Sequence, residues 1–217
     1  MAIKHPAGTS TSIDTRLRRL FDGGTEGNQL LTAVTGGVLI VLLAVVAVTI
    51  ISLTRLLWVH LCVGMALIGP VVLKLSSTGY RFARSYTASP RYRSKGPPPL
   101  PLRLIAPVVV ITTVAVFASG VALLFAGPGS RGTLLPLHKV AFFVWIPFTA
   151  LHVLAHLPPV LQALRVEYVT SAVPRDQVGA RAGRLLALFG ALSAGIVLAV
   201  LVIPQFSPWM VAHQLRH

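Results

Sequence analysis

Five long apolar runs alternate with short polar or basic segments along the chain. A helix rises about 1.5 Å per residue, so about 20 apolar residues are needed to cross the hydrocarbon core of a bilayer. Each run is close to this length. The pattern therefore predicts an all-α integral membrane protein, a bundle of about five transmembrane helices. The expected spans cover about residues 30–53, 56–77, 103–126, 136–158 and 185–204.

The segments between the runs are too short to fold as a second domain. We expect a transmembrane bundle over residues 29–205, with a cytoplasmic N-terminal segment over 1–28 and an outer tail over 206–217. Within residues 13–21, apolar side chains recur at helical spacing opposite arginines. This spacing predicts a short amphipathic helix that lies on the membrane surface.

Composition and charge agree with this interpretation. Mean hydropathy is +0.78 and charged residues make up 11% of the chain, against about a quarter in soluble domains. The net charge of +14 comes from basic residues concentrated in 78–103, in 159–184 and before the first run, whereas Arg55 and Arg131 stand alone in the other connections. The positive-inside rule then places the N-terminus in the cytoplasm and the C-terminus outside, in a multi-pass protein of the plasma membrane. Such charges suit the lipid bilayer and its anionic head groups, not nucleic acid.

Four of the seven histidines lie in the second and fourth runs, where an ionisable side chain is costly and indicates a functional site. His60 and His138 both fall near the start of spans that run in the same direction, so we expect them at similar depth near the outer face. Two imidazoles at one level on neighbouring helices are what a haem with two axial ligands requires. Gly64 lies one turn deeper on the face of His60, where it could leave room for the porphyrin edge or serve helix packing.

A second histidine level follows deeper in the fourth span. His152 lies 14 residues after His138, on the same helix face and about 21 Å deeper, and His156 follows 18 residues after His138 on that face. They project from one side of one helix and cannot bind one iron from opposite sides. The position 14 residues after His60 is Lys74, a poor axial ligand. We therefore expect one haem b near the outer face and leave a second, inner haem open.

Lys74 allows two interpretations. Its ammonium can extend along the lipid to the cytoplasmic surface. Alternatively, it can face the bundle as a cation for a haem propionate or a quinone-like substrate. The single cysteine, Cys62, excludes an internal disulfide and the CxxCH motif of covalent haem attachment.

The histidine-bearing segments resemble a known family. The stretch WVHLCVG at 58–64, with LHK at 137–139 and LHVLAH at 151–156, is similar to the pattern of bacterial membrane b-type cytochromes, the DUF4405, cytochrome b561-like and hydrogenase cytochrome b group. The resemblance covers roughly 30–160. It implies a four-helix haem-binding core, with the last span as an addition.

The resemblance implies haem iron ligands at His60, His138 and His152, with His156 as an alternate. Lys74 stands where a member with two haems would have a histidine. The chain carries no nucleotide-binding motif, so the resemblance implies an electron-transfer subunit that works with a separate redox partner protein or the quinone pool, not a complete enzyme.

Two alternatives use the same histidines differently. In an assembly or scaffold subunit, in a homo- or hetero-oligomer, interhelical hydrogen bonds would satisfy them without iron. In a small transporter, His152, His156 and Lys74 would form a protonatable pathway. All five Asp and Glu residues fall outside the expected spans, which disfavours a carboxylate relay.

Overall fold

The computed structural model describes residues 24–86, 100–168 and 175–215, and this part of the chain consists of helices and short connections. The surface helix predicted within 13–21 lies outside the described residues. The helices are α2 (Gly24–Ile51), α3 (Leu53–Ala66), α4 (Ile68–Tyr86), α6 (Leu100–Ala126), α7 (Arg131–Tyr168), α8 (Arg175–Leu201) and α9 (Ser207–Gln214), with the 3-10 turns η1 (Pro128–Ser130) and η2 (Ile203–Gln205).

Five stretches are helical, long and apolar enough to cross a membrane, which confirms the predicted all-α architecture and number of spans. α3 and α4 together form the second of these stretches. The observed stretches are Leu30–Ile51, Leu53–Ala83, Leu104–Ala126, Pro128–Pro158 and Arg181–Leu201.

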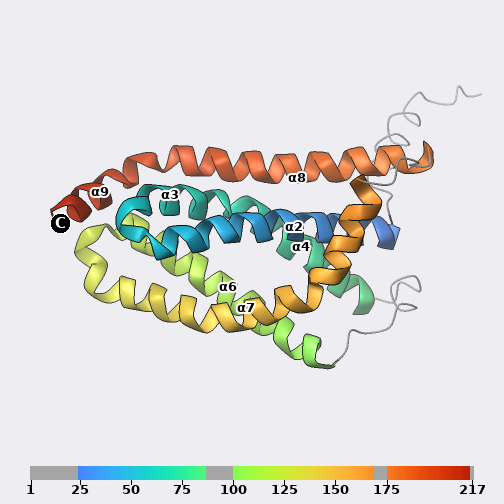
Figure 1. The fold of residues 1–217 in the computed structure, drawn as a ribbon, viewed down its shortest axis with the longest axis horizontal. Coiled ribbons are helices and arrows are strands. Elements are labelled where there is room, and N and C mark those ends of the chain that lie inside the picture. Colours follow the sequence, from blue (N-terminus) through green and yellow to red (C-terminus); the bar gives the residue numbers. More distant parts are fainter. Residues whose placement is uncertain (1–23, 87–99, 169–174, 216–217) are drawn as a thin grey trace, which may run out of the picture.

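The helices form a bundle in which α2, α3 and α4 lie between α8 on one side and the α6–α7 hairpin on the other (Figure 1). α8 packs against α3 and α4, whereas α7 packs against α6 and α2. We call the end that holds the α2–α3 connection, η1 and α9 the hairpin end. The opposite end, where α4 and α7 finish and α6 and α8 begin, is the basic end.

The second span is interrupted, although the sequence predicts one continuous run over 56–77. α3 ends at Ala66 and α4 begins at Ile68. Pro70 has no amide hydrogen, so the carbonyl of Ala66 loses the partner that a regular helix would give it. The hydrogen bond from the amide of Val71 to the carbonyl of Leu67, at 3.0 Å, keeps the two helices nearly continuous.

Two glycines allow α8 to approach this interruption at backbone distance. A Cβ added to Gly195 would overlap the carbonyl oxygen of Ala66, and one added to Gly69 would overlap the carbonyl oxygen of Ala191. In each glycine a Cα hydrogen therefore points at a carbonyl oxygen, which is the geometry of a weak Cα–H···O contact. The freed Ala66 carbonyl is thus covered by α8.

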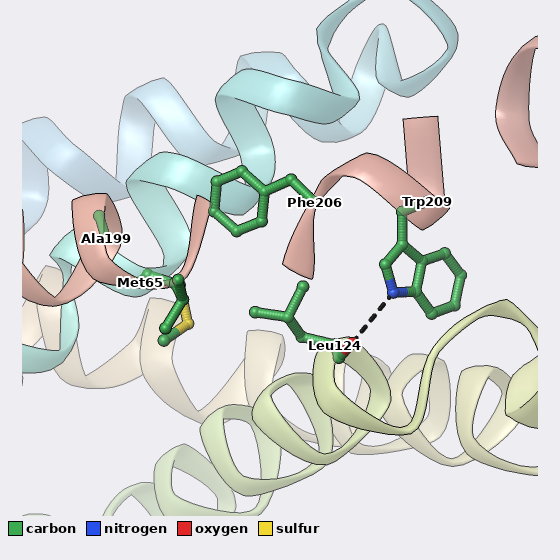
Figure 2. Close-up of a cluster of buried hydrophobic side chains, with 6 residues drawn as sticks. Met65, Leu124, Ala199, Phe206 and Trp209 are labelled. Carbon is green, nitrogen blue, oxygen red and sulfur yellow. Dashed lines mark hydrogen bonds between the residues drawn. The ribbon is translucent and has the colours of Figure 1, made fainter. Parts of the chain in front are cut away.

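The main apolar core lies at the hairpin end, where α9 folds back onto the bundle. Figure 2 shows the indole of Trp209 above the end of α6, where its Nε1 donates to the carbonyl of Leu124 at 3.2 Å. The ring of Phe206 meets that of Trp58 edge to face, with centroids 6.5 Å apart. This region lies in the predicted outer tail, because a helix of eight residues leaves no long apolar run in the sequence. The core consists of Met65, Leu124, Ala199, Val202, Phe206 and Trp209.

Large apolar side chains cover the outside of the bundle. Ile111 in α6, Phe143 in α7 and Leu186 in α8 are each about two-thirds exposed. An apolar surface spread over every span exceeds what soluble monomers expose. This surface and the length of the spans indicate a membrane protein.

The contact between α8 and α3 yields a test with a matched control in the same helix. We expect Gly195→Ala to lower the thermal unfolding midpoint in detergent, because its methyl group overlaps the Ala66 carbonyl and overpacking costs about 1–3 kcal/mol. Gly190→Ala adds a methyl group that meets nothing within 4 Å. It should leave stability unchanged or raise it by up to about 1 kcal/mol, the usual gain over glycine in a helix. Equal midpoints for the two variants would contradict the close approach.

Candidate functional site at two polar levels

Polar side chains inside the spans gather at two levels of the bundle. The hairpin-end cluster consists of Thr49, His60, Ser119 and His138. The basic-end cluster consists of Thr32, Lys74, Thr149, His152 and His156.

The fold brings His60 and His138 to the same level. Each is the eighth residue of its helix, since α3 begins at Leu53 and α7 at Arg131, and both helices start at the hairpin end. The two imidazoles lie within electrostatic reach of each other. The two rings thus lie at one level, although α3 and α7 do not pack closely on each other and α2 packs against both.

A threonine of α2 fixes the ring of His60. The Nδ1 atom of His60 lies 3.0 Å from Thr49 Oγ1, and Thr49 is almost completely buried. The hydroxyl proton of Thr49 is already donated to the carbonyl of Val46, at 2.6 Å. A hydroxyl has only one proton, so Thr49 accepts and His60 donates through Nδ1–H. In the neutral imidazole, Nε2 of His60 then carries the lone pair.

Ser119 of α6 does the same for His138. Its Oγ atom lies 3.0 Å from His138 Nδ1 and donates its own proton to the carbonyl of Val116, also at 3.0 Å. His138 therefore donates through Nδ1–H and keeps its lone pair on Nε2. Its ring lies against Gly120, where an added Cβ would be only 3.1 Å from Cε1. A larger residue at position 120 would displace this ring.

The imidazole of His138 also interacts with the backbone carbonyl of Val116, the same carbonyl that accepts from Ser119. With Nδ1 as the donor in both rings, Nε2 is the nitrogen that carries the lone pair. Metal-bound histidines typically show this arrangement, in which the second nitrogen donates to a protein oxygen and fixes the ring. Next to them, a Cβ added to Gly64 would meet nothing within 4 Å. The donor chemistry and the space beside Gly64 are both compatible with a haem.

In the basic-end cluster, Lys74 faces the bundle. Its Nζ atom donates to the carbonyl of Thr32 at 2.6 Å, and a Cβ added to Gly36 would lie 3.1 Å from it. The ammonium therefore packs against α2. The interpretation in which Lys74 extends along the lipid to the surface is wrong, because the missing side chain of Gly36 lets the ammonium reach the carbonyl of Thr32.

His152 and His156 stack on each other on one face of α7. Their ring centroids are 4.3 Å apart at an interplanar angle of 24°, and Nδ1 of His156 donates to the carbonyl of His152 at 3.0 Å. As the spacing predicts, they do not oppose each other across a common ligand. The nearest part of α7 to the Lys74 ammonium is Val160, since both lie beside Gly36.

Two polar atoms of this cluster are buried without a hydrogen-bond partner among the described residues. They are Nδ1 of His152 and the hydroxyl oxygen of Thr149, which lies three residues earlier on the same face of α7. Buried polar groups without partners are rare and usually have a reason such as a bound ligand or ion.

Sequence reasoning missed the hydroxyl residues. Thr49, Ser119 and Thr149 look like ordinary small residues of apolar runs, and only the tertiary structure shows which of them meets a histidine. His213, which lies in the predicted outer tail, also contacts the bundle, since its Nε2 lies 2.8 Å from the carbonyl oxygen of Thr54.

Other site types were sought among the described residues. No group of three or more His, Cys, Asp and Glu side chains there could hold a metal ion, and Cys62 is a free, half-buried thiol. A haem needs only two protein ligands, so this finding does not bear on it. Comparisons with protein-family models, with curated proteins and with solved structures found no match for the chain.

The hydrogen bond to His60 can be tested by removing one hydroxyl. We expect Thr49→Val, which keeps the shape of the side chain, to destabilise the protein by about 1–3 kcal/mol, because it leaves Nδ1–H of His60 buried without an acceptor. Thr112→Val is the matched control, since the Thr112 hydroxyl bonds only to carbonyls of its own helix. Chemical unfolding in detergent should separate the two variants. A Thr49→Val protein as stable as Thr112→Val would show that the bond does not contribute.

Proposed function

We propose that the chain is a membrane-embedded b-type cytochrome subunit that carries electrons through a haem b bound by His60 and His138. One observation carries the proposal: two imidazoles at one level, from α3 and α7, each place Nδ1 against a hydroxyl whose proton goes to a carbonyl of its own helix, an arrangement in which Nε2 would carry the lone pair for iron. Interhelical hydrogen bonding alone would account for one nitrogen of each ring and leaves the two Nε2 atoms unexplained. The resemblance of the histidine segments to bacterial membrane cytochromes points the same way.

When bound, a haem supplies reversible one-electron chemistry. The chain's own residues determine where and how it is bound. Thr49 and Ser119 hold the rings in position and, by accepting from Nδ1–H, increase the basicity of the opposite nitrogen. Gly64 leaves space beside His60.

The proposal is for one haem. At the basic end, His152 and His156 lie on one helix and Lys74 stands opposite, so two opposed histidine ligands are not offered there. The implied role of His152 as an iron ligand, with His156 as its alternate, is therefore not part of the proposal.

A separate redox partner would meet the protein outside the membrane. We place the protein in the plasma membrane with its basic end in the cytoplasm, following the positive-inside rule. The hairpin end then faces outward, with a hollow of about 390 Å³ that includes Arg131 and Lys139, the residue next to His138. Two cations beside the haem level suit a partner protein with an acidic face. The quinone pool is the other source or acceptor of electrons.

Spectroscopy of the purified full-length protein tests the proposal directly. We expect a Soret band and reduced α and β bands after dithionite, with a pyridine haemochrome stoichiometry of about one haem per chain, because two axial imidazoles define one site. Absence of haem after expression with an adequate haem supply would refute the proposal. It would favour the scaffold alternative, in which the histidines serve hydrogen bonding only.

Ligand assignment requires variants with a control. We expect His60→Ala and His138→Ala each to lose most of the haem, because one imidazole alone binds haem weakly, and added imidazole to restore a six-coordinate spectrum in part. His156→Ala removes a histidine of the same membrane region outside the proposed ligand pair, and it should keep the haem content of the wild type. Wild-type haem content in both His60→Ala and His138→Ala would overturn the assignment.

A further inference from the structure

A hollow of about 440 Å³ lies between α4 and α8, along the contact between these two helices, and we call it the α4–α8 groove. The residues that line it include Gly69, Val72 and Ser76 of α4 and Ala191, Ala194 and Leu198 of α8. Val72, Ser76 and Ala194 are exposed, so the groove opens on the outside of the bundle. Every lining residue belongs to one of the candidate spans, so the groove faces the hydrocarbon of a membrane.

The dimensions of the α4–α8 groove favour a narrow ligand. On α4 the groove extends from Ile68 to Ser76, which is about 12 Å of helix. A volume of about 440 Å³ over this length corresponds to a mean width of about 6 Å. A helix with its side chains is about 10–12 Å across, so a helix of another protein is too wide to fill the groove, whereas a single hydrocarbon chain is not.

A hydroxyl and a cation stand at one end of the groove. Ser76 follows Gly69 by seven residues, close to two turns of helix, so it lies about 10 Å nearer the basic end on the same face of α4. Arg184 precedes Ala191 by seven residues in α8, which runs in the opposite direction (Figure 1). Because Gly69 and Ala191 are in contact, the two positions reached in this way lie at about one level. The exposed hydroxyl of Ser76 has no hydrogen bond to any residue that the structure describes.

The charge around this end is strongly positive. The segments 78–103 and 159–184, which connect the helices at the basic end, contain ten Lys and Arg residues and two Asp and Glu residues. An excess of positive charge next to a membrane attracts lipids with anionic head groups. The groove is therefore apolar along most of its length, with a hydroxyl and positive charge at one end only.

We infer that the α4–α8 groove binds one acyl chain of an anionic phospholipid, whose head group lies at the basic end. The chain occupies the apolar part of the groove, because an unfilled hollow loses dispersion contacts on its lining. The Ser76 hydroxyl donates to an ester carbonyl of the lipid, and the positive charge at the level of Arg184 attracts the phosphate. The inference does not depend on the proposed haem, since neither His60 nor His138 lines the groove.

Native mass spectrometry of the full chain in detergent, with equal amounts of phosphatidylglycerol and phosphatidylcholine, tests the inference. We expect one lipid per chain to survive collisional activation, with phosphatidylglycerol retained about 5-fold over phosphatidylcholine, the effect of one basic side chain near an anionic lipid. Ala194→Phe places a ring in the groove and should reduce the retained lipid by about 5- to 100-fold, because overpacking excludes the chain. Ala150→Phe places the same ring on the exposed surface of α7 and should retain lipid as the wild type does.

Two further variants complete the test. Val72→Phe fills the groove from α4, so it should release the lipid even if Ala194→Phe does not fold. Arg184→Gln should retain lipid but lose most of the preference for phosphatidylglycerol, because it removes the cation at the level of Ser76. An unchanged preference in Arg184→Gln would contradict the position of the head group.

The inference is wrong if the wild type retains no lipid, if it retains both lipids equally, or if folded Ala194→Phe and Val72→Phe retain lipid as the wild type does. A quinone bound in place of the lipid, or a dimer that Ala194→Phe dissociates, would also overturn it, since either would identify another occupant of the groove.

Discussion

The constraint on which this structure depends is that a polar group inside lipid has no water to bond with and must find its partner within the protein. The hairpin-end cluster meets this requirement by a short chain of bonds. The imidazole of His60 donates to Thr49, which donates to a carbonyl of its own helix, and His138 uses Ser119 in the same way. Since each hydroxyl has only one proton, the donor and acceptor of every hydrogen bond in this series are fixed. The chemistry proposed for the two Nε2 atoms follows from that direction.

Packing brings these groups together, and it depends on backbone contacts more than on large side chains. Gly69 and Gly195 let α8 lie directly on the interrupted second span, where Pro70 has freed a carbonyl. At the hairpin end, Trp209 closes the bundle by donating to the last turn of α6. In lipid, close helix approach of this kind replaces the hydrophobic driving force available in water.

The two polar levels differ in charge and in completeness. At the hairpin end, neutral histidines are paired with hydroxyls and leave one nitrogen each for a ligand. At the basic end, Lys74 packs against α2, and α7 carries two buried polar atoms, Thr149 Oγ1 and His152 Nδ1, without hydrogen-bond partners among the described residues. The two levels therefore differ in chemistry, although the regular spacing of histidines along α7 suggests two equivalent sites.

The number of spans and the levels of the histidines were determined by the sequence itself, because run length and residue count convert directly into depth along a helix. Only the tertiary structure decided how each helix is rotated. In water, the polar face of a helix shows which side is exposed, but here the lipid is as apolar as the core, so α6 and α7 look alike on all sides. For that reason the sequence could not predict three features of the structure. They are the inward direction of Lys74, the pairing of Thr49 and Ser119 with histidines, and the position of α9. They depend on neighbours far away in sequence, at distances that apolar periodicity does not encode.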